Sequence, residues 1–253
     1  MGRAVAAAAA RADDLELIAG VSRAAAGERL AGLLDGEEVD GAVHASVADA
    51  LDAAEADVLV DYTHATVVRA NVLGALERGV AVVVGTSGLD ASDYEVIDER
   101  ARDAGVGVIA AGNFSLLAAL LLRSASEIAQ HVDSWEILDY GSAAKDDVPS
   151  GTARELAERL GSVRPPRVER PVSTVHGPAE ARGATVAGAQ VHSVRLPSFV
   201  VSTEVVFAAP GERLVLRHDP NESSEPYVAG TLLAVRRVGG RVGLARGLDT
   251  LLE

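Results

Sequence analysis

The sequence predicts an α/β protein with a Rossmann-like doubly wound parallel sheet and a second α+β domain with an open mixed sheet. Short apolar runs alternate with helix-forming segments in the first half of the chain, which is typical of parallel strands covered by helices. Aromatic residues make up only 3% of the chain, so Ala, Val and Leu must fill the core. Strands with few helices between them follow in the second half.

In the first half, helix and strand patterns follow one another closely. We expect an Ala-rich helix over residues 2–12, a strand over 15–21 and an irregular segment over 24–41, after which Ser46 begins a short helix. Buried strands are then expected at residues 58–62, 80–84 and 106–110, with helices at 66–77 and 92–104. Ligands of such a sheet bind at the carboxyl ends of its strands.

The second half begins with an apolar helix over 115–130. The predicted strands are 134–140, 190–196, 202–208 and 213–218, a Pro-rich loop covers 163–181, and a last helix covers 227–237. We therefore expect a first domain over residues 1–112 and a second domain over 113–226. Residues 227–253 form a segment that returns to the first domain.

Charge and composition exclude several classes of protein. Acidic residues outnumber basic ones 37 to 23, and a net charge of -14 argues against nucleic acid as a partner. The chain has no cysteine, and its six histidines lack metal-ligand spacing, so we expect a cytoplasmic protein without a metal site. Its apolar runs are too short to cross a membrane.

Small and polar residues follow the predicted strands. They are Thr63, then Gly85, Thr86 and Ser87, then Ala111, Gly112, Asn113 and Phe114. Such turns let a flat dinucleotide approach the backbone, although ordinary turn chemistry would also explain them. Ser22 and Arg23 follow the first strand, where a hydroxyl and a guanidinium suit a 2′-phosphate; a solvated surface Arg is the alternative.

The segment 145–153 predicts an anion site. Ser150 is a suitable N-cap, and the backbone N–H groups of Gly151 and Thr152 begin a helix whose positive end attracts a carboxylate or phosphate. Lys145 adds a charge on the same loop. A capped surface helix with an exposed Lys is the alternative reading.

Four motifs occur in order along the chain: Val60-Asp61-Tyr62-Thr63-His64, Gly85-Thr86-Ser87-Gly88, Asn113-Phe114-Ser115 and Lys145-x-Asp147-x-Pro149-Ser150-Gly151-Thr152-Ala153. This order closely resembles the 4-hydroxy-tetrahydrodipicolinate reductase family, which acts in lysine and diaminopimelate biosynthesis. The resemblance continues through residues 191–196, 211–214, 217–219 and 230–235, and so covers nearly the whole chain.

The resemblance implies a reductase that transfers a hydride from NADPH or NADH to a small cyclic dicarboxylate. It implies a dinucleotide-binding first domain, a substrate-binding and oligomerisation domain, and a homotetramer. Lys145 matches the catalytic lysine, and Ser150, Gly151 and Thr152 match the substrate-carboxylate turn. Gly2 and Arg3 match the end of the family's Gly-rich cofactor turn, and the strand-end residues named above would also hold the cofactor.

This chain departs from the family pattern in two places. Gly141 and Ser142 stand where the family has two histidines, the first of which is its proton donor, so Lys145, Tyr140 or water must supply the proton. Histidine at both positions should then raise the rate. The family's first strand and most of its Gly-rich turn precede the residues that match Met1, so we expect a longer natural chain and unpaired strand edges here.

These departures leave two further hypotheses. The protein could be a divergent oxidoreductase of the same fold with another carboxylated substrate, because a changed acid site beside a retained anion site fits altered substrate choice. It could also be a non-catalytic protein that binds a nucleotide or metabolite.

Overall fold

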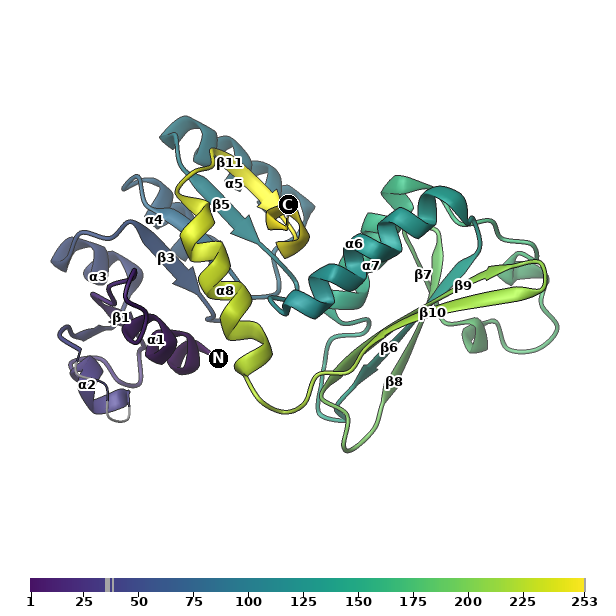
Figure 1. Cartoon of the computed structure of the whole chain (residues 1–253), viewed down its shortest axis with the longest axis horizontal. Helices are drawn as coiled ribbons and strands as arrows, with labels where there is room; N and C mark the ends of the chain where they lie inside the picture. Colours follow the sequence, from purple (N-terminus) through teal and green to yellow (C-terminus); the bar gives the residue numbers. More distant parts are fainter. Residues whose placement is uncertain (35–36, 38, 253) are drawn as a thin grey trace. The chain divides into compact units, whose positions relative to one another are not determined.

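The computed structural model describes residues 1–34, 37 and 39–252, and the chain forms two compact units (Figure 1). The first unit contains residues 1–115 and 224–253, and the second contains residues 116–223. The chain therefore leaves the first unit once and returns to it. Within the described residues, no helix is long and apolar enough to cross a membrane.

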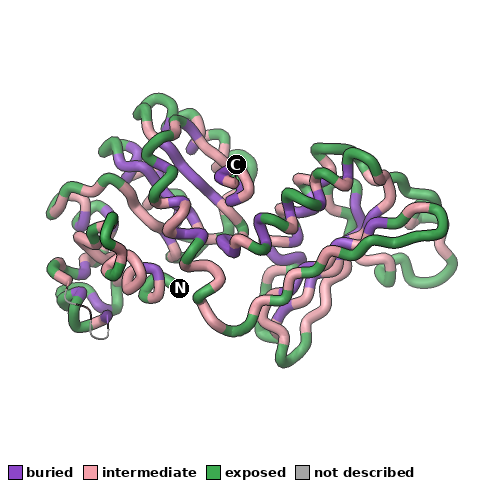
Figure 2. Tube along the Cα trace, in the orientation of Figure 1, coloured by how far each residue is buried: buried purple, intermediate pink, exposed green. Residues whose placement is uncertain are grey.

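A four-stranded parallel sheet forms the centre of the first unit. Its order is β11-β5-β4-β3, with β3 at Val58–Asp61, β4 at Ala81–Val84, β5 at Gly107–Ala110 and β11 at Gly243–Arg246. Strands β4 and β5 are buried along their whole length, as Figure 2 shows, because helices cover both faces. This agrees with the continuous apolar runs of the sequence.

The helices of this unit lie on the two faces of the sheet. Helices α4 (Val68–Leu76) and α5 (Ala91–Ala104) share a core with β4 and β5, and α8 (Glu225–Val238) lies across the opposite face (Figure 1). Helix α5 begins at a capping box in which Asp90 and Asp93 each accept a hydrogen bond from the other's backbone N–H. Leu248–Leu251 forms a final 3-10 turn.

A separate two-stranded parallel sheet lies in the N-terminal part of the same unit. It consists of β1 (Gly20–Val21) and β2 (Val43–His44) and is accompanied by α1 (Gly2–Ala10), α2 (Leu30–Leu33) and α3 (Val47–Ala53). The predicted strand over 15–21 is therefore wrong in length. Residues 15–19 pair with no neighbouring strand in the described part of the chain, and an apolar segment without a ladder partner is not a strand.

Strands β1 and β3 each keep one unpaired edge among the described residues, since β1 pairs only with β2 and β3 only with β4. This agrees with the expectation of exposed strand edges. Helix α2 lies within the segment predicted to be irregular, and residues 35, 36 and 38 of that segment lie outside the described residues.

The second unit is a mixed five-stranded sheet covered by two helices. The sheet order is β10-β9-β6-β8-β7, in which β6 and β8 are parallel and the other pairs are antiparallel. The strands are β6 (Trp135–Gly141), β7 (Ala184–Val186), β8 (Ala189–Arg195), β9 (Val201–Ala209) and β10 (Glu212–His218). The observed parallel and mixed sheets confirm the predicted fold class.

Helices α6 (Leu116–His131) and α7 (Gly151–Val163) share one apolar core with this sheet. Alternate residues of β6 are buried, from Trp135 through Ile137 and Asp139 to Gly141, so this face of the strand points into the core. Short 3-10 turns at Val172–Thr174 and Ala179–Arg182 lie within and at the end of the predicted Pro-rich loop. Strand β6 therefore brings Asp139 and Gly141 to the same face as helix α7.

Candidate active site

In the first unit, a buried carboxylate joins the carboxyl ends of β3 and β4. Asp61 is 1% exposed, and its Oδ1 accepts hydrogen bonds from the Thr63 backbone N–H (3.0 Å), the Thr63 hydroxyl (2.8 Å) and the Thr86 hydroxyl (2.6 Å). Its Oδ2 accepts from the amide of Asn71 at 2.8 Å. The structure thus brings Thr63 and Thr86 together at one edge of the sheet, and Asp61 fixes their positions.

Gly85 and Phe114 take part in packing at this edge. A Cβ at Gly85 would lie 2.1 Å from the ring of Tyr62, so the absence of a side chain at this position makes room for that ring. Phe114 is 2% exposed and meets Tyr62 edge to face at 6.0 Å. The whole residue is nearly buried and its carbonyl packs against Gly230, so Phe114 supports this edge by packing and the predicted cofactor contact at Phe114 is not supported.

The ring of Tyr62 is held by packing, and its hydroxyl is held by a hydrogen bond. Its hydroxyl forms a hydrogen bond with the Thr231 hydroxyl at 2.7 Å, and burial raises the pKa of Tyr62 to about 12. Tyr62 therefore stays neutral under physiological conditions and has a structural role at the sheet edge.

The end of β5 forms the next part of this edge. The Ala111 backbone N–H donates to the Val84 carbonyl, and the Asn113 side-chain oxygen accepts from the Ser115 backbone N–H at 2.8 Å. Gly112 and Ser87 are exposed. Because the strands are parallel, these residues lie at the same edge as Thr63 and Thr86.

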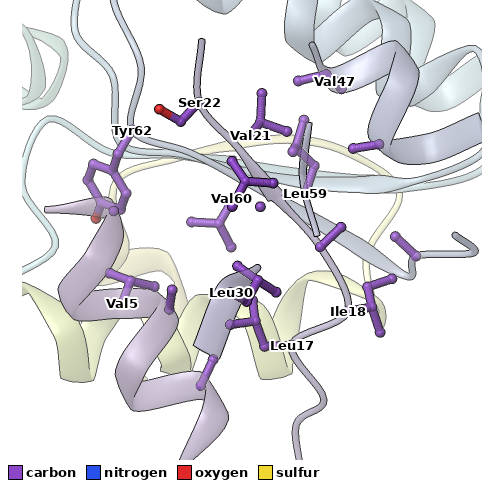
Figure 3. Close-up of a pocket in the computed structure, with 18 of the residues that line it drawn as sticks. Val5, Leu17, Ile18, Val21, Ser22, Leu30, Val47, Leu59, Val60 and Tyr62 are labelled. Atoms are coloured by element: carbon purple, nitrogen blue, oxygen red, sulfur yellow. The ribbon is translucent and has the colours of Figure 1, made fainter. Parts of the chain in front are cut away.

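A slot of about 400 Å³ lies between β1 and β3, which are separate strands of this unit (Figure 3). Gly2, Arg3, Ser22 and Thr63 line one part of it, so the structure brings together four of the predicted cofactor residues. Most of the remaining lining is apolar and includes the side chains labelled in Figure 3, such as Val5, Leu17, Leu30 and Val60. Arg23, next to Ser22, is exposed.

These residues fit a dinucleotide. Helix α1 begins at Gly2, where a Cβ would meet nothing within 4 Å, so a phosphate can approach the helix N-terminus closely. The guanidinium of Arg3 and the hydroxyl of Ser22 are suitable donors to phosphate or ribose oxygens.

In the second unit, Ser150 has the predicted capping role. Its side chain accepts a hydrogen bond from the Ala153 backbone N–H at 3.3 Å, and helix α7 begins at Gly151. A Cβ at Gly151 would meet nothing within 4 Å beyond its chain neighbours and its own helix backbone, so the first turn is open on that side. Thr152 forms the next position of the same turn.

A second buried carboxylate, that of Asp139, holds this turn through hydrogen bonds. Asp139 is 0% exposed, and its Oδ2 accepts from the Ser150 backbone N–H (2.9 Å), the Ser193 hydroxyl (3.0 Å) and the Arg195 guanidinium (2.7 Å). Burial alone would raise the pKa of Asp139, but the hydrogen bonds from Ser150, Arg195 and Ser193 lower it overall. Asp139 is therefore ionised and cannot act as a proton donor near neutral pH.

Lys145, the single lysine of the chain, forms an ion pair with Asp147 on the same loop. Its Nζ lies 2.6 Å from Oδ1 of Asp147, and its side chain is 27% exposed. Asp147 therefore has a defined ionic partner on its own loop.

Tyr140 is excluded as the proton donor of this site. It lies on the face of β6 opposite to Asp139 and Gly141, where it stacks on Phe199 at 5.2 Å and lies under the guanidinium of Arg217 at 4.8 Å. The Gly141 position faces Lys145 instead, since a Cβ there would lie 3.1 Å from Cδ of Lys145.

Three functional candidates received no role from the sequence: Asp61, Asp139 and Arg195. The two aspartates share a detectable pattern, because each stands near the end of an apolar strand, where a carboxylate needs partners. Arg195 carries no such pattern, and only the pairing of Gly141 with Arg195 across β6 and β8 places it in the site.

Comparison with known proteins gives a consistent result. Residues 1–114 match the family model of the dihydrodipicolinate reductase N-terminus, and residues 115–252 match that of its C-terminus. The 4-hydroxy-tetrahydrodipicolinate reductase of Moorella thermoacetica is 36% identical over 259 residues, which cover 100% of this chain and 94% of that protein. That of Syntrophomonas wolfei is 34% identical with the same coverage.

Solved structures agree with this. The dipicolinate-bound dihydrodipicolinate reductase from Paenisporosarcina sp. TG-14 has a TM-score of 0.77 and 26% identity, over 98% of this chain and 94% of that one. A myo-inositol dehydrogenase from Corynebacterium glutamicum has a TM-score of 0.63 at 15% identity, over 99% of this chain and 89% of that one, which shows the fold alone. The chain therefore belongs to the dihydrodipicolinate reductase family, whose members are NAD(P)H-dependent oxidoreductases of lysine biosynthesis.

Proposed function

We propose that this protein reduces 4-hydroxy-tetrahydrodipicolinate in lysine and diaminopimelate biosynthesis, with NADPH or NADH as the hydride donor. The observation that carries the proposal is the open first turn of α7, which is capped by Ser150 and supported by the buried carboxylate of Asp139. The dihydrodipicolinate reductase from Paenisporosarcina was solved with dipicolinate, a cyclic dicarboxylate of the same class.

The substrate carboxylate would bind at the first turn of α7. Gly151 and Thr152 lie at the positive end of a 13-residue helix, and Lys145 supplies a full positive charge from the preceding loop. Hydrogen bonds to a charged carboxylate are about twice as strong as neutral ones, so this turn favours a dianionic ring over a neutral substrate.

The cofactor would be held by the first unit. The proposed ligands are Gly2, Arg3, Ser22 and Thr63 around the slot, Thr86, Ser87, Gly112 and Asn113 at the ends of β4 and β5, and also Arg23 and the backbones of Gly85 and Ala111. When bound, the reduced nicotinamide supplies the hydride. The basic side chains Arg3 and Arg23 favour NADPH, since a guanidinium binds a 2′-phosphate well.

One proton must accompany the hydride. Gly141 and Ser142 carry no acidic group of suitable pKa, Tyr140 lies on the other face of β6, and Asp139 is ionised. Among the protein groups of this loop, the ammonium of Lys145 is the remaining donor, and Asp147 at 2.6 Å orients it. We assign to Lys145 both the carboxylate contact and the proton transfer.

The active form would be a cytoplasmic homotetramer in which the second unit provides the contacts. On β10 of this unit, Leu214 and Val215 are 48% and 49% exposed, which leaves apolar side chains on an edge strand without cover in the single chain.

Turnover of the purified protein tests the proposal. We expect oxidation of NADPH or NADH, followed by absorbance, when freshly generated 4-hydroxy-tetrahydrodipicolinate is added. Lys145→Met should lose about a hundredfold or more in kcat, while Arg170→Met, at an exposed loop position, should not. A wild-type rate no higher than the background would contradict the proposal.

A second candidate function follows from Gly141 and Ser142. Without the histidine pair, the same fold could reduce another carboxylated substrate, and a panel of cyclic and open-chain imino and oxo acids separates the two. Turnover of a different acid at a higher kcat/KM would favour this candidate. Binding of NADPH and dipicolinate without turnover of any acid would indicate a non-catalytic protein.

A further inference from the structure

We propose that Arg195 is the positioning residue of the anion-binding turn, and that Gly141 is glycine because the guanidinium of Arg195 and the stem of Lys145 occupy the space beside it. The inference rests on the proposed function for its consequence in catalysis, but its structural part does not require a substrate. It assigns a role to Arg195 and to Gly141, the position at which this chain departs from the family pattern.

The guanidinium of Arg195 connects three segments of the second unit. Its Nη2 donates to Oδ2 of Asp139 and to the carbonyl of Asp147, each at 2.7 Å. Its Nη1 donates to the carbonyls of Asp139 (3.1 Å) and Val194 (3.0 Å). The side chain is 14% exposed, so these bonds form largely out of water and fix its position.

The hydrogen bonds of Arg195 fix the anion-binding turn on two sides, at the loop before α7 and at the cap of α7. Asp147 is the ionic partner of Lys145, so the bond from Arg195 to the Asp147 carbonyl fixes the loop segment that orients the ammonium. Asp139 accepts from the Ser150 backbone N–H, so the same guanidinium also supports the carboxylate that fixes the helix cap. Arg195 therefore sets the position of Lys145 relative to the first turn of α7 without contacting a substrate itself.

The side chains of Arg195 and Lys145 leave little space beside Gly141. A Cβ there would lie 3.1 Å from Nη1 and 3.2 Å from Cζ of Arg195, and 3.1 Å from Cδ of Lys145. Such contacts are shorter than most Cβ contacts, and the guanidinium has little freedom to move because four hydrogen bonds hold it. A side chain at this position therefore requires Arg195 or the stem of Lys145 to shift by a few tenths of an ångström.

This geometry contradicts the expectation that histidine at both Gly141 and Ser142 raises the rate. Histidine at Gly141 should lower the rate, because its Cβ displaces the residues that orient the turn before its imidazole can act as an acid. Histidine at Ser142 alone does not meet this obstacle. The two positions are therefore not equivalent, although the family pattern has histidine at both.

Arg195→Lys is the first test, because it keeps a positive charge beside Asp139 but loses the planar guanidinium that reaches both Asp139 and Asp147. We expect the thermal midpoint to stay within a few degrees of wild type. Amide hydrogen exchange of the peptide covering residues 142–153 should be faster than in wild type, while that of the α6 peptide stays unchanged. Equal exchange in the 142–153 peptide would overturn the proposal whatever the substrate proves to be.

Gly141→Ala is the second test, with Gly74→Ala as its matched control, since a Cβ at Gly74 in α4 meets nothing within 4 Å. Reductive methylation with ¹³C-formaldehyde labels the single lysine and the N-terminus, so the Lys145 methyl signal reports the loop directly. We expect this signal to shift in Gly141→Ala and not in Gly74→Ala. An unshifted signal would show that the space at Gly141 is not needed.

Dipicolinate binding and steady-state kinetics show whether the role of Arg195 affects catalysis, and they test this separately from the proposed function. Arg195→Lys and Gly141→Ala should bind dipicolinate about tenfold to a hundredfold more weakly than wild type and lose a similar factor in kcat/KM, with NADPH affinity unchanged. If wild type itself shows neither binding nor turnover, the proposed function fails, and the exchange and methyl-lysine results still decide the role of Arg195. Wild-type kinetics in both variants would overturn that role.

Discussion

Asp139 is a fully buried carboxylate whose charge is compensated by Arg195 and by two hydrogen-bond donors, Ser150 and Ser193. Such a pair adds little net stability compared with an apolar pair, but removal of one partner leaves an uncompensated charge in the core. Replacement of Asp139 should therefore lower the free energy of unfolding because it breaks this network, and the loss should vary with pH.

We expect Asp139→Asn to lower the free energy of unfolding by about 3 kcal/mol at pH 7. The pKa of Asp139 is lowered in the folded protein, so the unfolded chain binds the proton more tightly. This contribution is therefore present above the unfolded pKa, near 4, and is lost as the pH falls through the folded value.

The difference in stability between wild type and Asp139→Asn should consequently shrink between pH 5 and pH 3, as measured by urea unfolding. The exposed Asp40 provides the control, since Asp40→Asn should change stability little at any of these pH values. A difference that stays constant with pH would show that Asp139 does not carry the charge.

Gly85 has a steric role that can be measured separately. Its missing Cβ leaves room for the Tyr62 ring, and Gly85→Ala should destabilise the first unit by about 1 to 3 kcal/mol in urea unfolding. Gly85→Ala combined with Tyr62→Leu should cost less than the sum of the single changes, because the smaller side chain removes the clash. Additive effects would contradict this role.

Residue types alone predicted the anion turn but not its support. Ser150 is recognisable as an N-cap, and Gly151 follows from the need for an open first turn, because both depend on neighbours in the sequence. Asp139, Ser193 and Arg195 come together through the register of β6 and β8. Register depends on the whole sheet and is not readable from a single strand.

At the scale of elements, strands with near-continuous apolar or alternating runs were predictable, including the edge strands β3 and β10, whereas β7 and β11 were not. Strands β4 and β5 are continuous apolar runs because helices cover both faces. Strands β7 and β11 were missed, because their sequences Ala-Thr-Val and Gly-Leu-Ala-Arg form no continuous apolar run and both depend on pairing with β8 or β5. Residues 15–19 show the opposite case, a largely apolar run that is not a strand because none of the described strands pairs with it.

The slot between β1 and β3 has the properties of a strand-binding site. Both strands have an unpaired edge among the described residues, and the lining between them is apolar, with Leu17 and Val60 in view in Figure 3. Gly2 of α1 lines the slot together with Ser22 and Thr63, which follow the carboxyl ends of β1 and β3. A parallel strand in the slot would therefore end where α1 begins.

We expect an added N-terminal segment with an apolar strand of five or six residues and a Gly-x-x-Gly-Arg turn to raise the thermal midpoint and tighten NADPH binding, because it would pair both edges and add backbone N–H donors for a phosphate. The matched control is an extension of equal length in which Ser and Asn replace the apolar residues. Differential scanning fluorimetry with and without NADPH measures both effects. Equal midpoints for the two extensions would contradict a strand in the slot.

At the scale of the whole molecule, the second unit is inserted into the first. Residues 116–223 form their own apolar core from α6, α7 and the mixed sheet, whereas the first unit needs residues from both ends of the chain. In particular, β11 and α8, which come after the insertion, complete the parallel sheet and cover its second face. The two units should thus differ in their ability to fold alone.

We expect residues 116–223, expressed alone, to fold cooperatively and to bind dipicolinate, because Asp139, Lys145, Ser150 and Arg195 all lie within them. Residues 1–115 alone should not fold, since they lack β11 and α8; joining 1–115 to 224–253 through a short linker should restore folding and NADPH binding. Circular dichroism, calorimetry and light scattering measure folding and assembly. If 116–223 assembles as a tetramer, its contacts are sufficient for oligomerisation, and a monomer would place them outside this unit.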